Sequence, residues 1–297
     1  MKENQISIPM IEVFPNKPEI KPLNWVQIGN KANDFLMDTS NGVLKSDRKG
    51  LKYFTAFLEG ESKELITYGC VVLGRILRGD DTDSFLPTLP EYFNKNWGIF
   101  LNEPDGDIIE YWYLMDVNAL ADAIIMKKLT LDNDIVENWR ISTNRLIDLA
   151  KSINYDFNAQ GHIFSKDIPY TNRDEFRQPD AIAGYSYLML LAYEFFKEDI
   201  YLHEAKKSMT MYQNFDKNPW YEIPSGAMAC LAAARLNSMG YSFDLNKILG
   251  FTFDSDIGSM LTGKYGNSEV NGLMIGWRGF SREEATSSAY SMETMIV

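Results

Sequence analysis

The sequence is poor in the residues that build disulfide frameworks and transition-metal centres. Its 297 residues include two cysteines, Cys70 and Cys230, and two histidines, His162 and His203. Two cysteines exclude a disulfide-rich scaffold and a zinc cluster built from thiolates. Two histidines exclude a mononuclear site with three histidine ligands. Carboxylates therefore remain as the main titratable groups, and we expect no resident cofactor.

Basic residues are also in deficit. Lys and Arg total 29 against 41 Asp and Glu, which gives a net charge of −12. Because nucleic-acid binding depends on neutralising phosphates, this balance predicts no nucleic-acid partner. It disfavours, more weakly, an anionic membrane surface. A globular composition remains, with 45% hydrophobic and 13% aromatic residues.

The sequence shows neither a membrane span nor a signal peptide. The longest uncharged apolar run, residues 181–193, suits a buried helix and is too short to cross a bilayer. The first residues lack a basic start followed by an apolar stretch. The default location is therefore cytoplasmic, although a periplasmic or extracellular chain that had lost its signal peptide would read the same.

Two kinds of helical segment alternate along the chain. Prolines 9, 15, 18 and 22 predict an extended N-terminal arm over residues 1–30. Beyond it, four segments are apolar on nearly every side, namely residues 65–77, 113–126, 181–196 and 226–236. Residues 132–153 and 201–215 are instead amphipathic. Helices apolar all round must be buried, and amphipathic helices cover a core from outside. We therefore expect an all-α fold, an (α/α) toroid of inner and outer helices over residues 31–297; an irregular helical bundle is the alternative.

The connections between these helices are unequal in length. Those from inner to outer helices are short, as at residues 127–131 and 197–199. Those from outer to inner helices are long: residues 93–107, 154–178, 215–222 and 250–281. In a two-layered ring, all connections of one kind emerge on one face. Long loops on a rigid scaffold are where binding usually occurs. They also carry aromatic residues, including Trp97, Trp220 and Trp277, whose flat rings suit sugars.

Carboxylates stand at the predicted starts of the inner helices. They are Glu103, Asp107, Asp180 and Glu222. Hydrolysis of a glycosidic bond needs two carboxyl groups, about 5–5.5 Å apart for retention or about 6.5–9.5 Å for inversion of configuration. Acidic residues also cap helix N-termini without any catalytic role, which is the alternative interpretation for each of them.

A second chemistry is offered by the loop at residues 154–178. His162 or Tyr170 would act as a base in elimination from a uronic acid, and Arg173 and Arg177 would neutralise the substrate carboxylate. His203 follows the amphipathic pattern and, beside Glu204, is expected at the surface. The acidic run at residues 80–83 follows an apolar helix. It is expected in a solvated turn, where it would at most bind a calcium ion.

Three stretches resemble a known group of proteins. They are residues 176–185 (FRQPDAIAGY), residues 218–222 (NPWYE), and residues 233–237 (AARLN) before Gly240. Together they resemble bacterial members of the six-hairpin glycosidase superfamily, the (α/α) toroids, from about residue 93 to residue 297. The resemblance implies a role in carbohydrate metabolism, without specifying a reaction. It also implies that Gln178, Asp180, Tyr221 and Glu222 lie near the central cavity.

The predicted ring is incomplete. A full toroid of this kind has twelve helices, and the sequence supplies nine or ten, with residues 285–297 resembling the start of another inner helix. We therefore expect a truncated ring or a homo-oligomer that covers the open side.

The resulting hypothesis is a carbohydrate-active protein, a glycoside hydrolase of oligo- or polysaccharides. Its catalytic candidates are Asp180, Glu103, Asp107 and Glu222. Its substrate-binding candidates are Trp97, His162, Tyr170, Arg173, Arg177, Gln178, Trp220, Tyr221 and Trp277. The alternatives are a polysaccharide lyase acting on uronic-acid glycans and a non-catalytic glycan-binding scaffold.

Overall fold

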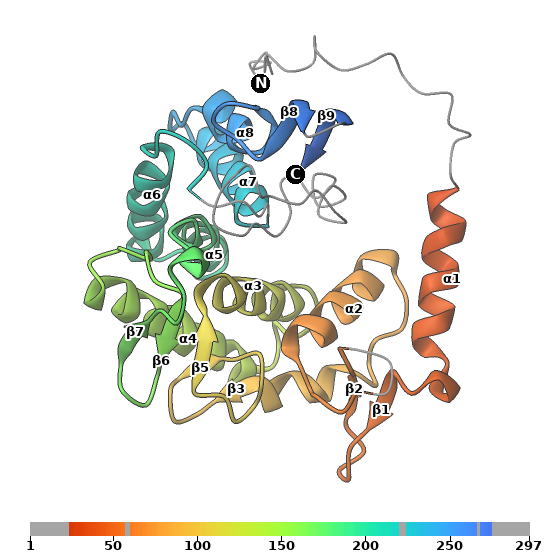
Figure 1. Cartoon of the computed structure of the whole chain (residues 1–297). Coiled ribbons are helices and arrows are strands. Elements are labelled where there is room, and N and C mark those ends of the chain that lie inside the picture. Colours follow the sequence, from red (N-terminus) through yellow and green to blue (C-terminus); the bar gives the residue numbers. More distant parts are fainter. Residues whose placement is uncertain (1–23, 57–59, 220–223, 266–267, 275–297) are drawn as a thin grey trace. The chain divides into compact units, whose positions relative to one another are not determined.

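The computed structural model describes residues 24–56, 60–219, 224–265 and 268–274 (Figure 1). The chain separates into two compact units. Unit 1 contains the described residues of 147–162 and 168–274, and unit 2 contains those of 24–146 and 163–167. The predicted inner helix at residues 285–297, and with it the closure of the ring, lies outside the described residues.

Unit 2 is built from helices with short hairpins between them. Its elements are α1 (Trp25–Met37), β1 (Leu44–Ser46), β2 (Lys52–Phe54), α2 (Leu65–Arg78), β3 (Phe93–Asn94), β4 (Ile99–Phe100), β5 (Ile108–Glu110), α3 (Tyr111–Lys128) and most of α4 (Asn133–Ser152). Strands β1 and β2 pair antiparallel, as do β3 and β4.

Helix α1 begins inside the predicted N-terminal arm. The Asn24 side chain accepts a hydrogen bond from the backbone N–H of Gln27, so it caps the first turn. Residues 25–30, expected to be extended, are therefore helical, because a capped helical turn satisfies backbone donors that an extended arm would leave to solvent. Residues 1–23 of the arm lie outside the described part of the chain.

Helices α2 and α3 pack together in unit 2 (Figure 1). At Gly69 of α2, an added Cβ atom would lie 2.9 Å from the Cβ of Leu120 on α3. The missing side chain therefore permits the close approach of the two helices. Helix α3 is joined to α4 by Asn118, which accepts a 2.6 Å hydrogen bond from the hydroxyl of Ser142.

Unit 1 contains consecutive helices that are followed by a β-hairpin. Its elements are the end of α4, then β6 (Gly161–Ile163), β7 (Ile168–Tyr170), a 3₁₀ turn η4 (Asp174–Phe176), α5 (Ala181–Phe196), α6 (Asp199–Gln213), α7 (Pro224–Ser238), α8 (Leu245–Phe253), β8 (Met260–Tyr265) and β9 (Ser268–Met274). Strands β8 and β9 form an antiparallel hairpin, with Met260 opposite Met274.

Helix α5 forms the centre of unit 1. It packs against both α6 and α7, and α7 packs against α8 (Figure 1). Eleven of its sixteen residues are buried, from Ala181 to Ala192, as expected for an inner helix. It ends at Lys197, whose left-handed φ of 61° turns the chain directly into α6. Gly226 of α7 lies close to Thr252 of α8, which accounts for a small residue at that position.

The helical pattern in the sequence is confirmed by these bounds. The six segments predicted as inner or outer helices correspond to α2, α3, α4, α5, α6 and α7. Within the described ranges, every helix is too short or too polar to cross a bilayer.

Candidate functional site

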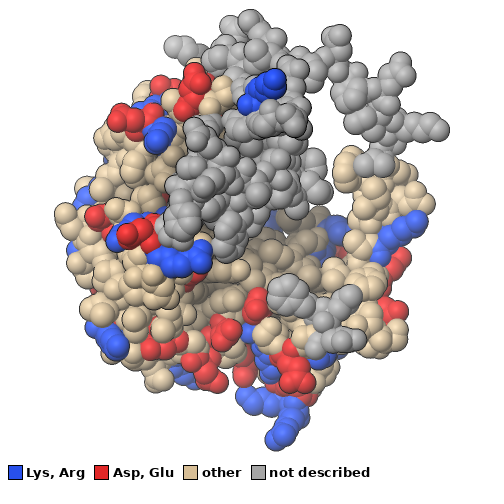
Figure 2. Space-filling view, in the orientation of Figure 1, with Lys and Arg blue, Asp and Glu red and all other residues tan. Residues whose placement is uncertain are grey.

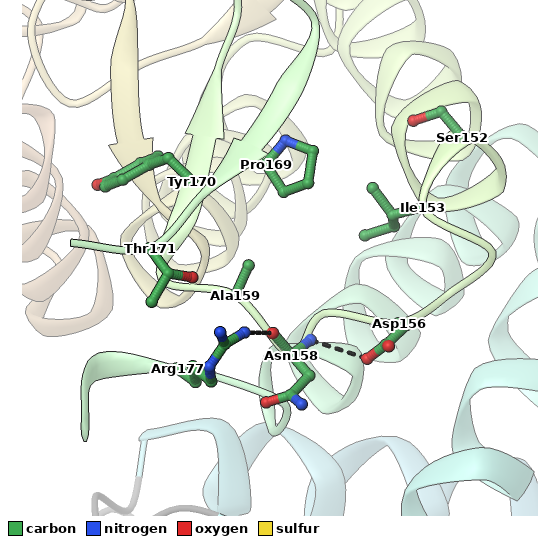
Figure 3. Close-up of a pocket in the computed structure, with 9 residues that line it drawn as sticks. All are labelled: Ser152, Ile153, Asp156, Asn158, Ala159, Pro169, Tyr170, Thr171 and Arg177. Carbon is green, nitrogen blue, oxygen red and sulfur yellow. Dashed lines mark hydrogen bonds between the residues drawn. The ribbon is translucent and has the colours of Figure 1, made fainter. Parts of the chain in front are cut away.

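A pocket of about 370 Å³ opens in unit 1 (Figure 3). Its walls come from the end of α4, the loop that follows it, β7 with Thr171, and Arg177 directly after η4. Its lining residues are Ser152, Ile153, Asp156, Asn158, Ala159, Pro169, Tyr170, Thr171 and Arg177. The pocket therefore lies on the long connection from the outer helix α4 to the inner helix α5.

Arg177 is the cation of this pocket, and its charge is already compensated. Its Nε and Nη2 atoms each lie 2.9 Å from the Oδ1 atom of Asp174. Its Nη1 atom donates to the backbone carbonyl of Asn158 (Figure 3). The guanidinium thus ties the η4 segment to the loop after α4, and it keeps further N–H groups for a ligand.

The loop after α4 has two faces. Tyr155 and Phe157 are buried, whereas Asp156 and Asn158 are exposed and line the pocket. The Asp156 carboxylate accepts a 3.0 Å hydrogen bond from the backbone N–H of Asn158 (Figure 3). Alternate side chains therefore serve the core and the pocket.

The inner face of this loop is tied to a buried carboxylate. Glu204 of α6 is 2% exposed, and it accepts hydrogen bonds from the hydroxyls of Tyr155, at 3.1 Å, and Tyr185, at 2.9 Å. The Lys207 ammonium lies 3.3 Å from the centre of the Tyr155 ring. Burial, more than the neighbouring Glu204, raises the pKa of the Tyr155 and Tyr185 phenols, so both remain donors at neutral pH.

Four predicted residues in this loop lie at different depths. Tyr170 and Arg177 line the pocket. Arg173 is exposed, and its guanidinium carbon lies 3.8 Å from the centre of the Phe176 ring. His162 is completely buried, which leaves no ring surface for a ligand in this conformation. Its predicted role as a base therefore gains no support from its position.

Gln178 and Asp180 are both buried at the start of α5. The backbone N–H of Gln178 donates to the carbonyl of Ala159, which joins the helix start to the pocket wall. Asp180 is 3% exposed. Burial and then the charge of Asp180 raise the pKa of Tyr212, so these two groups lie near each other. The catalytic role of Asp180 stays a prediction.

The three predicted site residues in unit 2 make separate contacts. Trp97 is half-buried and stacks on Phe164, with ring centres 6.5 Å apart. Glu103 is exposed. Asp107 accepts 2.6 Å hydrogen bonds from both the backbone N–H and the hydroxyl of Ser165. These contacts join Asp107 to a residue 58 positions further along the chain, and no described contact joins it to Glu103.

Four predicted residues lie outside the described chain, namely Trp220, Tyr221, Glu222 and Trp277. The proposed pairing of Glu222 with another carboxylate therefore stays a prediction.

Sequence reasoning missed the buried anchor of the pocket loop. His203 is exposed, as expected, but the neighbouring Glu204, which was not singled out, is buried. The spacing of Tyr201, Ala205 and Ser208 on α6 would have placed position 204 on the buried face of the helix. The alternation at residues 155–158 was a further signal for a wall with two faces.

Charged residues elsewhere are mostly paired or dispersed. Asp80 lies within 3.7 Å of Arg75 and 3.0 Å of Arg78 in the acidic run considered for calcium. Among the described residues, no three potential ligands of the His, Cys, Asp and Glu types gather as a metal site. On the described part of the face in Figure 2, acidic and basic side chains intermingle in small groups.

The fold belongs to the class of (α/α) toroids of alternating helices. A solved toroid structure, titled as the crystal structure of D-mannose isomerase, is similar, with a TM-score of 0.51 and 11% sequence identity. The match covers 84% of this chain and 76% of that one. No family model matches the sequence, and no curated protein is similar to it. The likeness establishes the fold class predicted from the sequence.

Proposed function

We propose that this chain is a carbohydrate-active protein that binds a small, neutral sugar in the pocket of unit 1. The observation that carries the proposal is the composition of that pocket. Carboxylate, amide, hydroxyl and guanidinium groups converge on it beside the ring of Tyr170 and the apolar Ile153 and Pro169. A sugar presents the matching combination of hydroxyl groups and apolar C–H faces.

The size of the pocket supports a small ligand. Its volume of about 370 Å³ lies at the lower end of the roughly 300–1,000 Å³ typical of small-molecule sites. The similarity of the fold to a structure titled D-mannose isomerase makes a monosaccharide a reasonable first probe. A longer glycan would extend beyond the lining residues.

The charges of the pocket favour a neutral sugar over a uronic acid. The Arg177 guanidinium is compensated by Asp174, and the Asp156 carboxylate lines the same pocket. A ligand carboxylate would gain little from Arg177 and would be repelled by Asp156. This arrangement weighs against the elimination of uronic acids that Tyr170 and Arg177 suggested in the sequence.

For the reaction, hydrolysis of a glycosidic bond remains the leading proposal. It would use two carboxyl groups from the set Asp180, Glu222, Glu103 and Asp107. Of these, Asp180 follows Gln178, whose backbone N–H is bonded to the pocket wall at Ala159. Its own carboxyl is 3% exposed and does not line the pocket, so hydrolysis there would require the start of α5 to open. The alternative is a protein that binds the sugar in the same pocket and does not catalyse a reaction.

Isomerisation of an aldose to a ketose is a second candidate. One observation favours it: the fold similarity to a structure titled D-mannose isomerase. At 11% identity this similarity transfers no residue roles. The reaction would need a base beside C2 of the sugar, and Asp156 is the carboxylate that lines the pocket.

Calorimetric titration with D-mannose tests the binding site. Arg177→Ala should weaken binding at least about tenfold, because a charged donor is lost from the wall. Arg235→Ala is the matched control in the same unit. The two arginines are similarly exposed, at 39% and 36%, and each pairs with one carboxylate. Arg235 does not line the pocket, so its replacement should change the affinity by less than about twofold.

The same titration with D-glucuronate tests the charge argument. The native chain should bind the anionic sugar more weakly than D-mannose. Equal loss of D-mannose binding in both arginine variants, or preference for D-glucuronate, would contradict the assignment of the pocket.

Product analysis of the native chain separates the reactions. New reducing ends from mixed oligosaccharides indicate hydrolysis, and a ketose formed from D-mannose indicates isomerisation. Reducing ends accompanied by an absorbance increase from an unsaturated product indicate a lyase, which would overturn the neutral-sugar proposal. Sugar binding without any product would identify a binding protein.

A further inference from the structure

The pocket loop holds an unfavourable backbone conformation. Asn154 and Tyr155, directly after α4, have φ values of 52° and 60°. This left-handed region costs about 1 kcal/mol or more for a residue such as Tyr155, and less for asparagine. Two consecutive residues in it need surrounding contacts that fix them, and the sequence places no glycine there.

Tyr155 supplies such a contact through its side chain. Its backbone N–H closes α4 by donating to Ala150, at 2.7 Å. Its phenol reaches the buried Glu204, which is 49 residues away in the sequence. A hydrogen bond to a buried carboxyl oxygen contributes about 1–3 kcal/mol, comparable with that backbone cost.

The same contact determines where the pocket wall lies. Tyr155 and Phe157 both pack against the ring of Tyr185, with centres 6.4 and 6.0 Å away. Asp156 and Asn158 alternate with them and line the pocket. Because side chains alternate along this segment, fixing the inner pair fixes the direction of the outer pair.

We propose that Glu204 is a positioning residue that holds the Asp156–Asn158 wall of the sugar pocket in place through the phenol of Tyr155. Glu204 itself is buried and does not line the pocket, so it acts only through the loop. The inference rests on the proposed sugar site for its functional meaning. Its structural content, the order of residues 156–159, is measurable without any ligand.

Two tyrosine variants separate positioning from simple stability. Tyr155→Phe and Tyr185→Phe each remove one hydroxyl that donates to the same Glu204 carboxylate, at 3.1 and 2.9 Å. Both keep their aromatic ring, so the core packing is preserved. Tyr155 belongs to the loop, whereas Tyr185 belongs to helix α5. A merely structural role of Glu204 would make the two variants equivalent.

Hydrogen–deuterium exchange of the full chain measures the order of the loop. Tyr155→Phe should speed exchange at residues 156–159 by about tenfold, the factor that corresponds to roughly 1.4 kcal/mol. Tyr185→Phe should leave exchange there within about twofold, although both variants lower the melting temperature. Equal acceleration in both variants, or none in either, would overturn the positioning role.

Titration with D-mannose provides the functional measurement. Tyr155→Phe should raise the dissociation constant about tenfold, and Tyr185→Phe should leave it nearly unchanged. An unchanged dissociation constant in Tyr155→Phe would overturn the proposal. If the native chain does not bind D-mannose, the proposed sugar site is contradicted, while the exchange measurement still decides whether Glu204 orders the loop.

Discussion

The two units treat a buried acid in opposite ways. Glu204 of unit 1 and Asp122 of unit 2 are both 2% exposed and both lie on helices. Glu204 receives two phenol hydrogen bonds. Asp122 has an Oδ1 atom with no hydrogen-bond partner among the described residues. Burial therefore raises the pKa of Asp122 well above its usual range, and the neighbouring Trp139 opposes this only in part.

This difference shows what determines the consequence of burying a carboxyl group. A buried carboxyl group needs hydrogen-bond donors to replace the water it has lost. In unit 1 the donors come from two tyrosines, one of which belongs to the pocket loop. In unit 2 the Asp122 carboxyl lies on α3, where Trp139 offsets the effect of burial on its pKa only in part.

The long loops of the two units differ in the same sense. In the 93–107 segment of unit 2, Asn94 bonds back to the backbone of residues 96, 97, 104 and 106. Asp107 is likewise occupied, by Ser165 of the next long connection. In unit 1, Asp156, Asn158 and Arg177 also make hydrogen bonds within their own connection, but they line an open pocket as well. Polar residues in a long loop therefore indicate a binding site only where they also line a pocket.

The largest effect is expected from removing the satisfied acid. Glu204→Ala leaves two buried phenols without their hydrogen-bond acceptor and creates a cavity. The free energy of unfolding should therefore fall by about 3–5 kcal/mol. Chemical denaturation of the purified chain measures this change. Thr210→Ala, at an exposed position on the same helix, should stay within about 0.5 kcal/mol of the native chain. A loss below about 1 kcal/mol in Glu204→Ala would show that the phenols do not depend on the carboxylate.

The unsatisfied acid should reveal itself through pH. Because the folded pKa of Asp122 is raised, the folded state keeps a proton that the unfolded state releases. The resulting stability is fully present below the unfolded pKa of about 3.9 and is lost as pH rises through the folded pKa. Between these values, the free energy of unfolding should fall by about 1.4 kcal/mol per pH unit from this group.

Asp122→Asn isolates this contribution. The side chain of the variant cannot ionise. As pH rises from 5 to 8, the free energy of unfolding of the variant should therefore increase relative to that of the native chain. Asp105→Asn, which removes an exposed acid in the same unit, should follow the native pH curve. Parallel curves for the native chain and Asp122→Asn would mean that Asp122 is ionised in the folded protein.

The smallest effect is expected at the half-exposed acid of unit 2. Ser165→Ala removes the hydroxyl that donates to Asp107 but keeps the backbone donor, so the loss should be about 1 kcal/mol. Thermal unfolding measures it, with Ser62→Ala as a control because that hydroxyl bonds to Glu64 in exposed surroundings. If sugar binding also weakened sharply in Ser165→Ala, Asp107 would have a role beyond this structural contact.

Some of the site was readable from the sequence, and some was not. Tyr170 and Arg177 were predicted in the binding loop, and both line the pocket. Their loop was recognisable because it is long, polar and placed between two strongly periodic helices. Asp156 and Asn158 were not singled out, because only the burial of Tyr155 and Phe157 turns them outward. The partners of Glu204 are 19 and 49 residues away, beyond the reach of any local pattern.

The sequence by itself determined the six helices α2 to α7, their order and the alternation of buried with amphipathic ones. Apolar periodicity is a local property that burial must satisfy in almost any packing. Tertiary structure alone decided which buried acids have hydrogen-bond donors. It also decided which polar loop residues line a pocket. Those outcomes depend on side chains brought together from distant positions, where a hydrogen bond present or absent changes the free energy of a buried charge by several kcal/mol.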